Sequence, residues 1–78
     1  MKDILNLLVY EFNSHFKSKL DQKKILKVNK NNFSQWDSLE HLKFLLRIEK
    51  KFKFKFLTQE IINIHSFKEI YKILKTKL

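Results

Sequence analysis

The sequence predicts an all-α fold, a small four-helix bundle of three longer helices and one short helix, in a single domain over residues 1–78. Three observations support this fold. The 78 residues include no Gly and no Pro, so the chain lacks the residues that tight β-hairpin turns usually need. Apolar residues recur at helical spacing in three long stretches. Two of these stretches begin with a capping signal, Asp37 followed by Glu40 and Ser66 followed by Glu69.

The first helix is predicted from Ile4 to about residue 17 or 20, with Asp3 as its N-cap. Its apolar residues are Ile4, Leu5, Leu8, Val9, Phe12 and Phe16. Residues 18–36 follow no sustained period, and the Asn-rich run at 29–32 indicates a loop. A connection this long in a small domain more often has a function than none.

The second long helix is predicted to follow Asp37, its N-cap, with Glu40 completing the capping box. Its apolar face comprises Leu39, Leu42, Leu45, Leu46, Ile48 and Phe52. The alternating Lys and Phe residues at 51–56 allow two interpretations. They are either a strand that stacks on single-stranded nucleic acid, or the end of the helix with Phe side chains turned into the core. We favour the second, because no other strand is predicted to pair with the first.

The remaining two helices lie in the last third of the chain. A short helix is predicted from Thr58, and it carries Ile61, Ile62 and Ile64. The last helix begins after Ser66, which forms a capping-box pattern with Glu69. Its apolar stripe consists of Phe67, Ile70, Tyr71, Leu74 and Leu78.

The composition excludes several kinds of functional site. Without Cys there is no disulfide or thiolate metal site, and without Gly there is no glycine-rich phosphate-binding loop. The histidines His15, His41 and His65 are far apart in the sequence, so we expect no metal site and take each as a surface or boundary residue. Ser38 and His41 have the spacing of a nucleophile and its base, but no orienting group or oxyanion hole accompanies them. We therefore expect no enzymatic activity.

The formal net charge of +9 suggests an anionic partner, such as nucleic acid or a membrane surface. Two counts weaken this suggestion. Only one of the 17 basic residues is Arg, which recognises phosphates and base edges better than Lys does. Lys, Asn and Ile have A/T-rich codons and make up 30 of the 78 residues, so the charge can also reflect nucleotide composition. Charged residues interrupt every apolar run, and the N-terminal segment lacks the pattern of a signal peptide. We expect a monomeric, cytoplasmic protein without a membrane span.

The region around Ser38 resembles the acyl carrier protein family. That family has an Asp-Ser-Leu motif where its second helix begins, and here residues 36–39 read Trp-Asp-Ser-Leu. The family's helix ends in a pattern similar to Leu-Glu-x-x-Phe, and here residues 48–52 read Ile-Glu-Lys-Lys-Phe. The resemblance continues without a gap to Ile70, whereas the first helix matches only in length and pattern.

The resemblance implies that Ser38 Oγ is esterified with 4′-phosphopantetheine, transferred from coenzyme A by a phosphopantetheinyl transferase. The protein would then be a phosphoprotein whose added thiol carries acyl or aminoacyl groups as thioesters. Asp37 would contact the metal ion of the transferase. The implied docking residues for loading and transferring enzymes are Leu39, Glu40, Lys43 and Arg47. The implied acyl pocket is lined by Leu42, Leu46, Phe56, Ile61 and Ile64.

Two departures from the family pattern bear on the partners. Family members are usually acidic, but here lysines stand at four positions where acidic residues are common: Lys43, Lys50, Lys51 and Lys55. A partner with an acidic docking surface is therefore expected. Trp36 replaces a small residue, which is similar to standalone carriers of specialised biosynthetic pathways. The alternatives are a small basic helical domain that binds nucleic acid, and a module that docks on a protein or an anionic membrane through amphipathic first and last helices.

Overall fold

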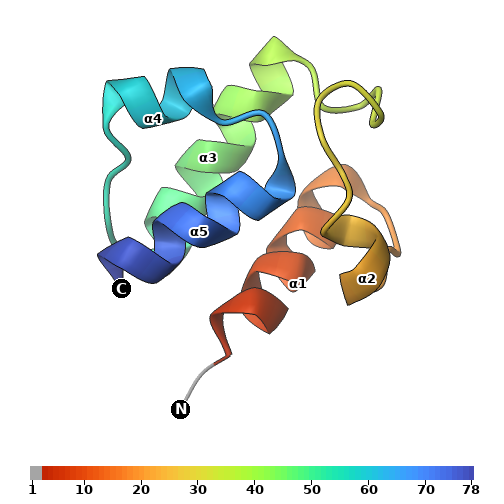
Figure 1. Cartoon of the computed structure of the whole chain (residues 1–78), viewed down its shortest axis with the longest axis horizontal. Coiled ribbons are helices and arrows are strands. Elements are labelled where there is room, and N and C mark those ends of the chain that lie inside the picture. The colour runs from red at the N-terminus through yellow and green to blue at the C-terminus, as the bar shows by residue number, and fades with distance from the viewer. Residues whose placement is uncertain (1–2) are drawn as a thin grey trace.

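The computed structural model describes residues 3–78, which form five helices and no strand. Met1 and Lys2, part of the N-terminal segment considered for a signal peptide, lie outside the described residues. The helices are α1 (Ile4–Phe16), α2 (Gln22–Ile25), α3 (Ser38–Phe52), α4 (Thr58–Asn63) and α5 (Phe67–Lys77) (Figure 1). The all-α prediction is confirmed. α2 was not predicted, because four residues are too few to show a helical period.

The helix packing centres on α1, which contacts α2, α3 and α5 (Figure 1). The buried apolar residues come from the three long helices, from α2, and from the connections α2–α3, α3–α4 and α4–α5. They are Leu8, Phe12, Phe16, Ile25, Val28, Trp36, Phe44, Leu45, Ile48, Phe56, Ile64, Phe67, Ile70 and Leu74. The Phe12 ring of α1 lies at the centre of this core, with the Phe44 ring of α3 at 5.4 Å and the Phe67 ring of α5 at 5.6 Å. Both pairs have edge-to-face geometry, which favours aromatic contacts beyond simple burial.

The predicted N-caps form in the structure. Oxygen atoms of Asp3, Asp37 and Ser66 each accept a hydrogen bond from a backbone amide in the first turn of the following helix. The reciprocal bonds of the two predicted capping boxes do not form. The Glu40 carboxylate contacts α1 instead, and the Glu69 carboxylate accepts from the amide of the residue before Ser66. Neither carboxylate therefore accepts from the backbone amide of its N-cap residue, which is the bond that a capping box requires.

The Lys-Phe alternation at 51–56 is not a strand. α3 continues to Phe52, and Lys53 ends it in the left-handed conformation with φ 57° and ψ 54°. The Phe56 side chain is buried in the core, and its amide donates to Oε2 of Glu49 at 2.7 Å. The Phe54 ring packs 4.7 Å from the Phe56 ring. The interpretation that this stretch ends the helix and buries Phe side chains is confirmed.

The connection between α1 and α3 is anchored to the rest of the fold. Asn29 and Ser66 form an isolated antiparallel bridge. In it the Lys30 amide donates to the His65 carbonyl at 2.9 Å, and the Phe67 amide donates to the Val28 carbonyl at 3.1 Å. This bridge holds the segment that leads to Ser38 against the start of α5. Among residues 3–78, no helix has the length and apolar character to cross a membrane.

Candidate functional site

Ser38 is the first residue of the fifteen-residue helix α3, and it is exposed. Its neighbour Asp37 is in an extended conformation, and Oδ1 of Asp37 accepts from the Glu40 amide at 2.9 Å. The Ser38 hydroxyl therefore lies at the positive end of the helix dipole, where unpaired backbone amides favour an anionic group. The local sequence dictates this placement, because an N-cap residue fixes where the helix begins.

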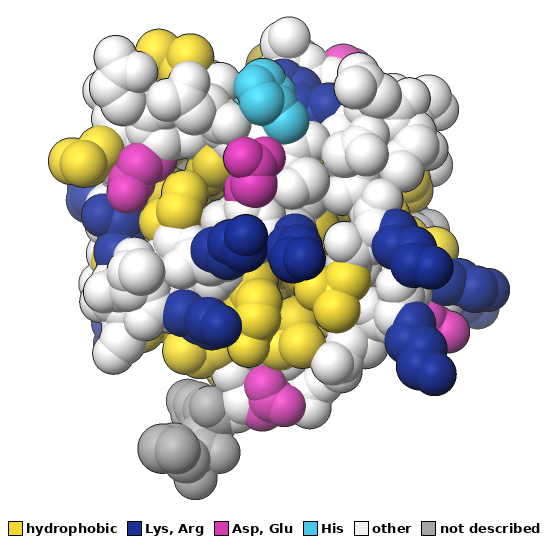
Figure 2. All heavy atoms as spheres, viewed as in Figure 1, with side chains coloured by type: hydrophobic (Ala, Val, Ile, Leu, Met, Phe, Trp, Pro, Cys, Tyr) yellow, Lys and Arg dark blue, Asp and Glu magenta, His cyan; other side chains and the backbone are white. Residues whose placement is uncertain are grey.

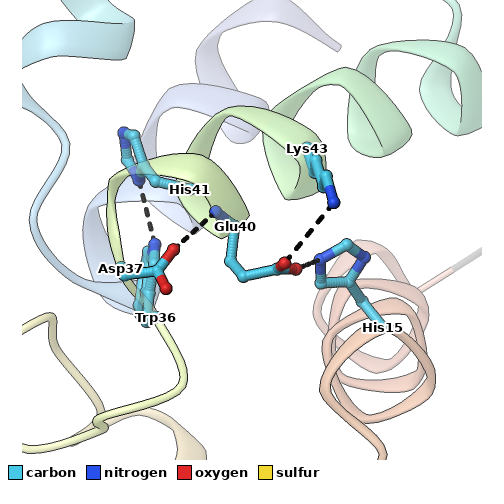
Figure 3. Close-up of polar contacts among 6 residues, drawn as sticks. All are labelled: His15, Trp36, Asp37, Glu40, His41 and Lys43. Carbon is cyan, nitrogen blue, oxygen red and sulfur yellow. Dashed lines mark hydrogen bonds and ion pairs between the residues drawn. The ribbon is translucent and has the colours of Figure 1, made fainter.

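The buried His41 side chain, in the first turn of α3, forms a hydrogen bond at each ring nitrogen, and Figure 3 shows the bond to Trp36. The Trp36 indole Nε1–H donates to His41 Nδ1 at 2.9 Å, and His41 Nε2 lies 2.8 Å from the Ile61 carbonyl of α4. A carbonyl oxygen can only accept, so Nε2 carries the ring proton and Nδ1 is the acceptor. Burial lowers the pKa of His41. The bond to Ile61 opposes this shift, and the charges of Lys30 and His65 add to it. The imidazole is therefore neutral and holds both α4 and the segment before Ser38.

The structure corrects one expectation about His41. It is not a surface or boundary residue, because only 6% of it is exposed. It also cannot act as the base for Ser38, because both of its ring nitrogens are already bonded to Trp36 and Ile61. Sequence reasoning missed the hydrogen bond between Trp36 and His41. The two residues are five positions apart, but this spacing predicts no contact, because Trp36 precedes the helix that contains His41.

Glu40, which the sequence analysis expected to be a docking residue, connects α3 to α1. His15 Nε2 donates to Glu40 Oε1 at 2.9 Å, and Lys43 Nζ lies 3.7 Å from Oε2 of the same carboxylate (Figure 3). The His15 side chain is only 13% exposed. Sequence reasoning missed His15, because 25 residues separate it from Glu40 and no local pattern joins them. The Glu40 carboxylate is thus partly committed to the contact between α1 and α3.

A second ion pair connects the same two helices, nearer the start of α1 and the end of α3 than the first. Arg47 Nε donates to Oε1 of Glu11 at 2.8 Å, and Lys51 Nζ lies 3.9 Å from Oε2. The Glu11 side chain is buried, whereas the Arg47 side chain remains 37% exposed. Two of the lysines and the single Arg predicted on the docking side of α3 therefore already face an acidic residue of the chain itself.

Three leucines of α3 are exposed, and we call them the leucine stripe: Leu39, Leu42 and Leu46. Their exposed fractions are 61%, 45% and 48%. The sequence placed them with Leu45 and Ile48 on one apolar face, and that assignment is wrong, because Leu45 and Ile48 are buried and the three leucines are not. Leu39 was also expected at the surface, as a docking residue. The core-facing side of α3 consists instead of His41, Phe44, Leu45 and Ile48. The helix is thus apolar on two sides, of which the leucine stripe is the one left at the surface.

The five residues expected to line an acyl pocket occupy different environments. Phe56 and Ile64 are buried, Ile61 is partly buried, and Leu42 and Leu46 belong to the leucine stripe. One open depression of about 370 Å³ lies between α4 and α5, and Ile64 is the one expected lining residue that reaches it. Another of about 490 Å³ lies between α1 and α3, and Leu46 is the one expected residue there.

Basic side chains are distributed over the surface in separate groups. Figure 2 shows the face that carries α5 and α1, where lysines lie over the middle and again at the edge near α2. Apolar and uncharged atoms lie between these groups, and carboxylates lie above and below the central group, so this face has no continuous basic track. The Phe side chains that were considered as a stacking platform lie at least partly in the core. Three residues of each predicted apolar stripe are buried, Leu8, Phe12 and Phe16 in α1 and Phe67, Ile70 and Leu74 in α5, whereas Leu78 is 55% exposed.

Comparison with known proteins adds no relative. No protein-family model matches this sequence, and no curated protein matches it. Among residues 3–78, no three His, Asp or Glu side chains lie close enough together to hold a metal ion.

Proposed function

We propose that this chain is an acyl carrier protein that holds pathway intermediates on a 4′-phosphopantetheine arm attached to Ser38. One observation carries the proposal: Ser38 is an exposed hydroxyl at the N-terminus of a long helix, directly after the capping Asp37. The helix order also fits a carrier bundle, with long α1, α3 and α5, a short α4, and α2 as an addition within the long connection.

The surroundings of Ser38 suit a phosphodiester. The first turn of α3 supplies backbone amides and the positive end of the helix dipole, both of which stabilise an attached anion. Ser38 Oγ would form the new bond to the phosphorus that carries the pantetheine arm, while the phosphoanhydride bond of coenzyme A breaks and adenosine 3′,5′-bisphosphate leaves. The hydroxyl proton of Ser38 would pass to a base of the transferase. His41 is not available as this base, since both of its ring nitrogens are bonded elsewhere. The thiol of the bound arm would supply the thioester linkage to the acyl or aminoacyl cargo.

Asp37 has an oxygen atom available for a second role. Its Oδ1 accepts from the Glu40 amide, and this bond leaves Oδ2 on the same exposed carboxylate. We propose that this oxygen contacts the metal ion of the phosphopantetheinyl transferase during loading of Ser38. Capping and metal contact would thus use different oxygens of one side chain.

The cargo is proposed to be short or polar and to remain outside the core. Phe56 and Ile64 are part of the packed core, and they do not enclose a cavity together with Leu42 and Leu46. A long acyl chain would have to displace these side chains. The protein would work as a monomer in the cytoplasm, within a specialised biosynthetic pathway.

Mass spectrometry tests the attachment. The purified chain is incubated with coenzyme A, Mg²⁺ and a broad-specificity phosphopantetheinyl transferase, and its intact mass is then measured. We expect the chain to gain one phosphopantetheinyl group. Ser38→Ala should gain none, whereas Ser34→Ala, which removes another exposed hydroxyl four residues earlier, should gain the same mass as the original chain. No gain in the original chain, or a gain in Ser38→Ala, would refute the proposal.

A further inference from the structure

A basic groove runs between α1 and α3. We use this name for the open depression of about 490 Å³ that is lined by His15, Lys43, Leu46, Arg47 and Lys50. Its lining includes three permanent cations, one histidine and one leucine, and no carboxylate. Four of the five lining residues belong to α3, and His15 of α1 forms the opposite side.

The cations around this groove outnumber the nearby acidic residues. Glu40 lies beside His15 and Lys43, and Glu11 lies beside Arg47 and Lys51, so two carboxylates face four permanent cations once Lys50 is included. Within residues 3–78, no carboxylate lies within ion-pair distance of Lys50. Lys43 keeps 55% of its side chain exposed, and Arg47 keeps 37%. The groove therefore retains positive charge that the chain itself does not neutralise.

The leucine stripe borders the groove and supplies apolar contact area. Leu46 belongs to both features, and Leu42 and Leu39 continue the stripe toward Ser38 at helical spacing. Exposed leucines next to charged side chains are typical of a protein-binding surface, which has an apolar centre and a polar rim. The stripe extends toward the N-terminus of α3, so a partner that covers both the groove and the stripe would reach the region of Ser38.

We infer that the basic groove and the leucine stripe together bind one segment of a partner protein, which carries carboxylates next to apolar side chains. The carboxylates would pair with Lys43, Arg47 and Lys50, and the apolar side chains would cover the stripe. The ion pairs to Glu40 and Glu11 hold Lys43 and Arg47 in place, so these two side chains lose less freedom on binding. This inference deepens the proposed function, since on a carrier protein the partner would be an enzyme that acts on the group attached to Ser38.

Two other anionic partners fit the surface less well. A membrane-bound helix inserts a wide apolar face, but the wide apolar face of α3, with Phe44, Leu45 and Ile48, is already buried in the core. The phosphates of a nucleic acid would match the cations but would leave the leucine stripe without an apolar partner, and only one of the three groove cations is Arg, which recognises phosphates better than Lys does. A protein segment can match both the fixed cations and the leucines.

Titration with designed peptides tests the inference on the unmodified, ¹⁵N-labelled chain. The probe is a short helical peptide with leucines on one side and glutamates beside them, and the matched peptide has Gln in place of each Glu. We expect the Glu peptide to shift the amide signals of α3 residues 42–50 and of His15, with an affinity that falls as salt rises. The Gln peptide should bind much more weakly.

A pair of charge-reversal variants supplies the control. Lys43→Glu with Lys50→Glu changes the groove, and Lys68→Glu with Lys72→Glu makes the same charge change on exposed positions of α5. We expect the groove variant to bind the Glu peptide roughly ten-fold more weakly at low salt, and the α5 variant to bind it nearly as well as the original chain does. Circular dichroism on both variants verifies that they remain folded.

Three results would overturn the inference. They are equal binding of the Glu and Gln peptides, signal shifts that map to another face, and equal weakening in the two charge-reversal variants. Anionic vesicles or a single-stranded oligonucleotide that shift the groove signals at lower concentration than the peptide would replace the protein partner with that ligand. Because these titrations do not involve Ser38, their failure leaves the mass-spectrometric test of the carrier function unaffected, and the reverse also holds.

Discussion

Trp36 donates its indole N–H to Nδ1 of His41 at 2.9 Å, although Trp36 precedes α3 and His41 lies within it. Because the other ring nitrogen of His41 bonds to the Ile61 carbonyl at 2.8 Å, one neutral imidazole connects the segment before Ser38, α3 and α4. Protonation of Nδ1 would place a second N–H opposite the indole N–H. The structure therefore depends on His41 being neutral.

Stability should fall when the pH drops below the ordinary pKa of histidine. Burial lowers the pKa of His41 in the folded chain below the ordinary histidine value of 6.5, so the unfolded chain binds more protons as the pH falls below 6.5. The stabilising contribution is thus complete above pH 6.5 and is lost as the pH falls from there toward the lowered pKa. Urea unfolding at several pH values measures this loss.

The same urea series on variants isolates the contribution of His41. His41→Gln should be less stable than the original chain at neutral pH, and the difference between them should narrow as the pH falls. His65→Gln, which changes an exposed histidine whose charge is the smallest of the causes that lower the pKa of His41, should keep most of the pH dependence of the original chain. A constant difference between the original chain and His41→Gln across the series would contradict the prediction.

Two substitutions of Asp37 separate capping from loading. Asn caps a helix about as well as Asp does, so Asp37→Asn should unfold at nearly the same urea concentration as the original chain. It lacks the charged oxygen proposed to contact the transferase metal, so its loading rate should fall sharply. Asp37→Ala should load slowly and also lose about 1 kcal/mol of stability. Loading of Asp37→Asn at the original rate would show that Asp37 acts only as the cap.

The ion pair between Glu11 and Arg47 should stabilise the contact of α1 with α3. Glu11 is buried and Arg47 is partly exposed, so we expect a coupling energy between that of a surface pair and that of a fully buried pair, about 1–3 kcal/mol. A double-mutant cycle of Glu11→Gln and Arg47→Met, measured by urea unfolding, gives this energy. Lys50→Gln in place of Arg47→Met serves as the control, and the coupling with Glu11 should then be close to zero.

Glycine at position 53 should stabilise the chain. Lys53 ends α3 with φ 57°, and a residue with a Cβ atom in this left-handed conformation costs about 1 kcal/mol. Part of the gain is offset because glycine loses more conformational freedom on folding. We therefore expect Lys53→Gly to raise the free energy of unfolding by about 0.5 kcal/mol. Lys53→Ala removes the same charge without relieving the conformation, so it should not be stabilised; equal gains in both variants would assign the effect to charge.

Four of the five helices, all but α2, and the N-caps of α1, α3 and α5 could be predicted from the sequence, because both depend on residues within one or two turns. The contacts that shape the candidate site could not. Glu40 lies 25 residues from His15, and Arg47 lies 36 residues from Glu11, so no local pattern indicates either ion pair. Glu40 has the capping-box position in the sequence. Its carboxylate could bond either to the Asp37 amide or to His15 of α1, and the packing of α1 decides between these two partners.

The leucine stripe shows a second limit of sequence reasoning. At about 100° per residue, Leu39, Leu42 and Leu46 form one apolar side of α3, and Phe44, Leu45 and Ile48 form another. Periodicity alone does not indicate which side faces the core. The choice depends on volume, because the large rings of Phe12 and Trp36 pack on the side of Phe44, and this information lies in other parts of the chain.

The bridge between Asn29 and Ser66 bears on the order of events during synthesis. Lys30 and Val28 find their backbone partners in residues 65 and 67, and His41 finds one of its partners in residue 61. A chain that has left the ribosome only as far as α3 therefore contains Ser38 but none of these partners. The segment before Ser38 acquires its final shape only when α4 and the start of α5 have been translated. An enzyme that recognises that shape would act on the finished protein and leave incomplete chains unmodified.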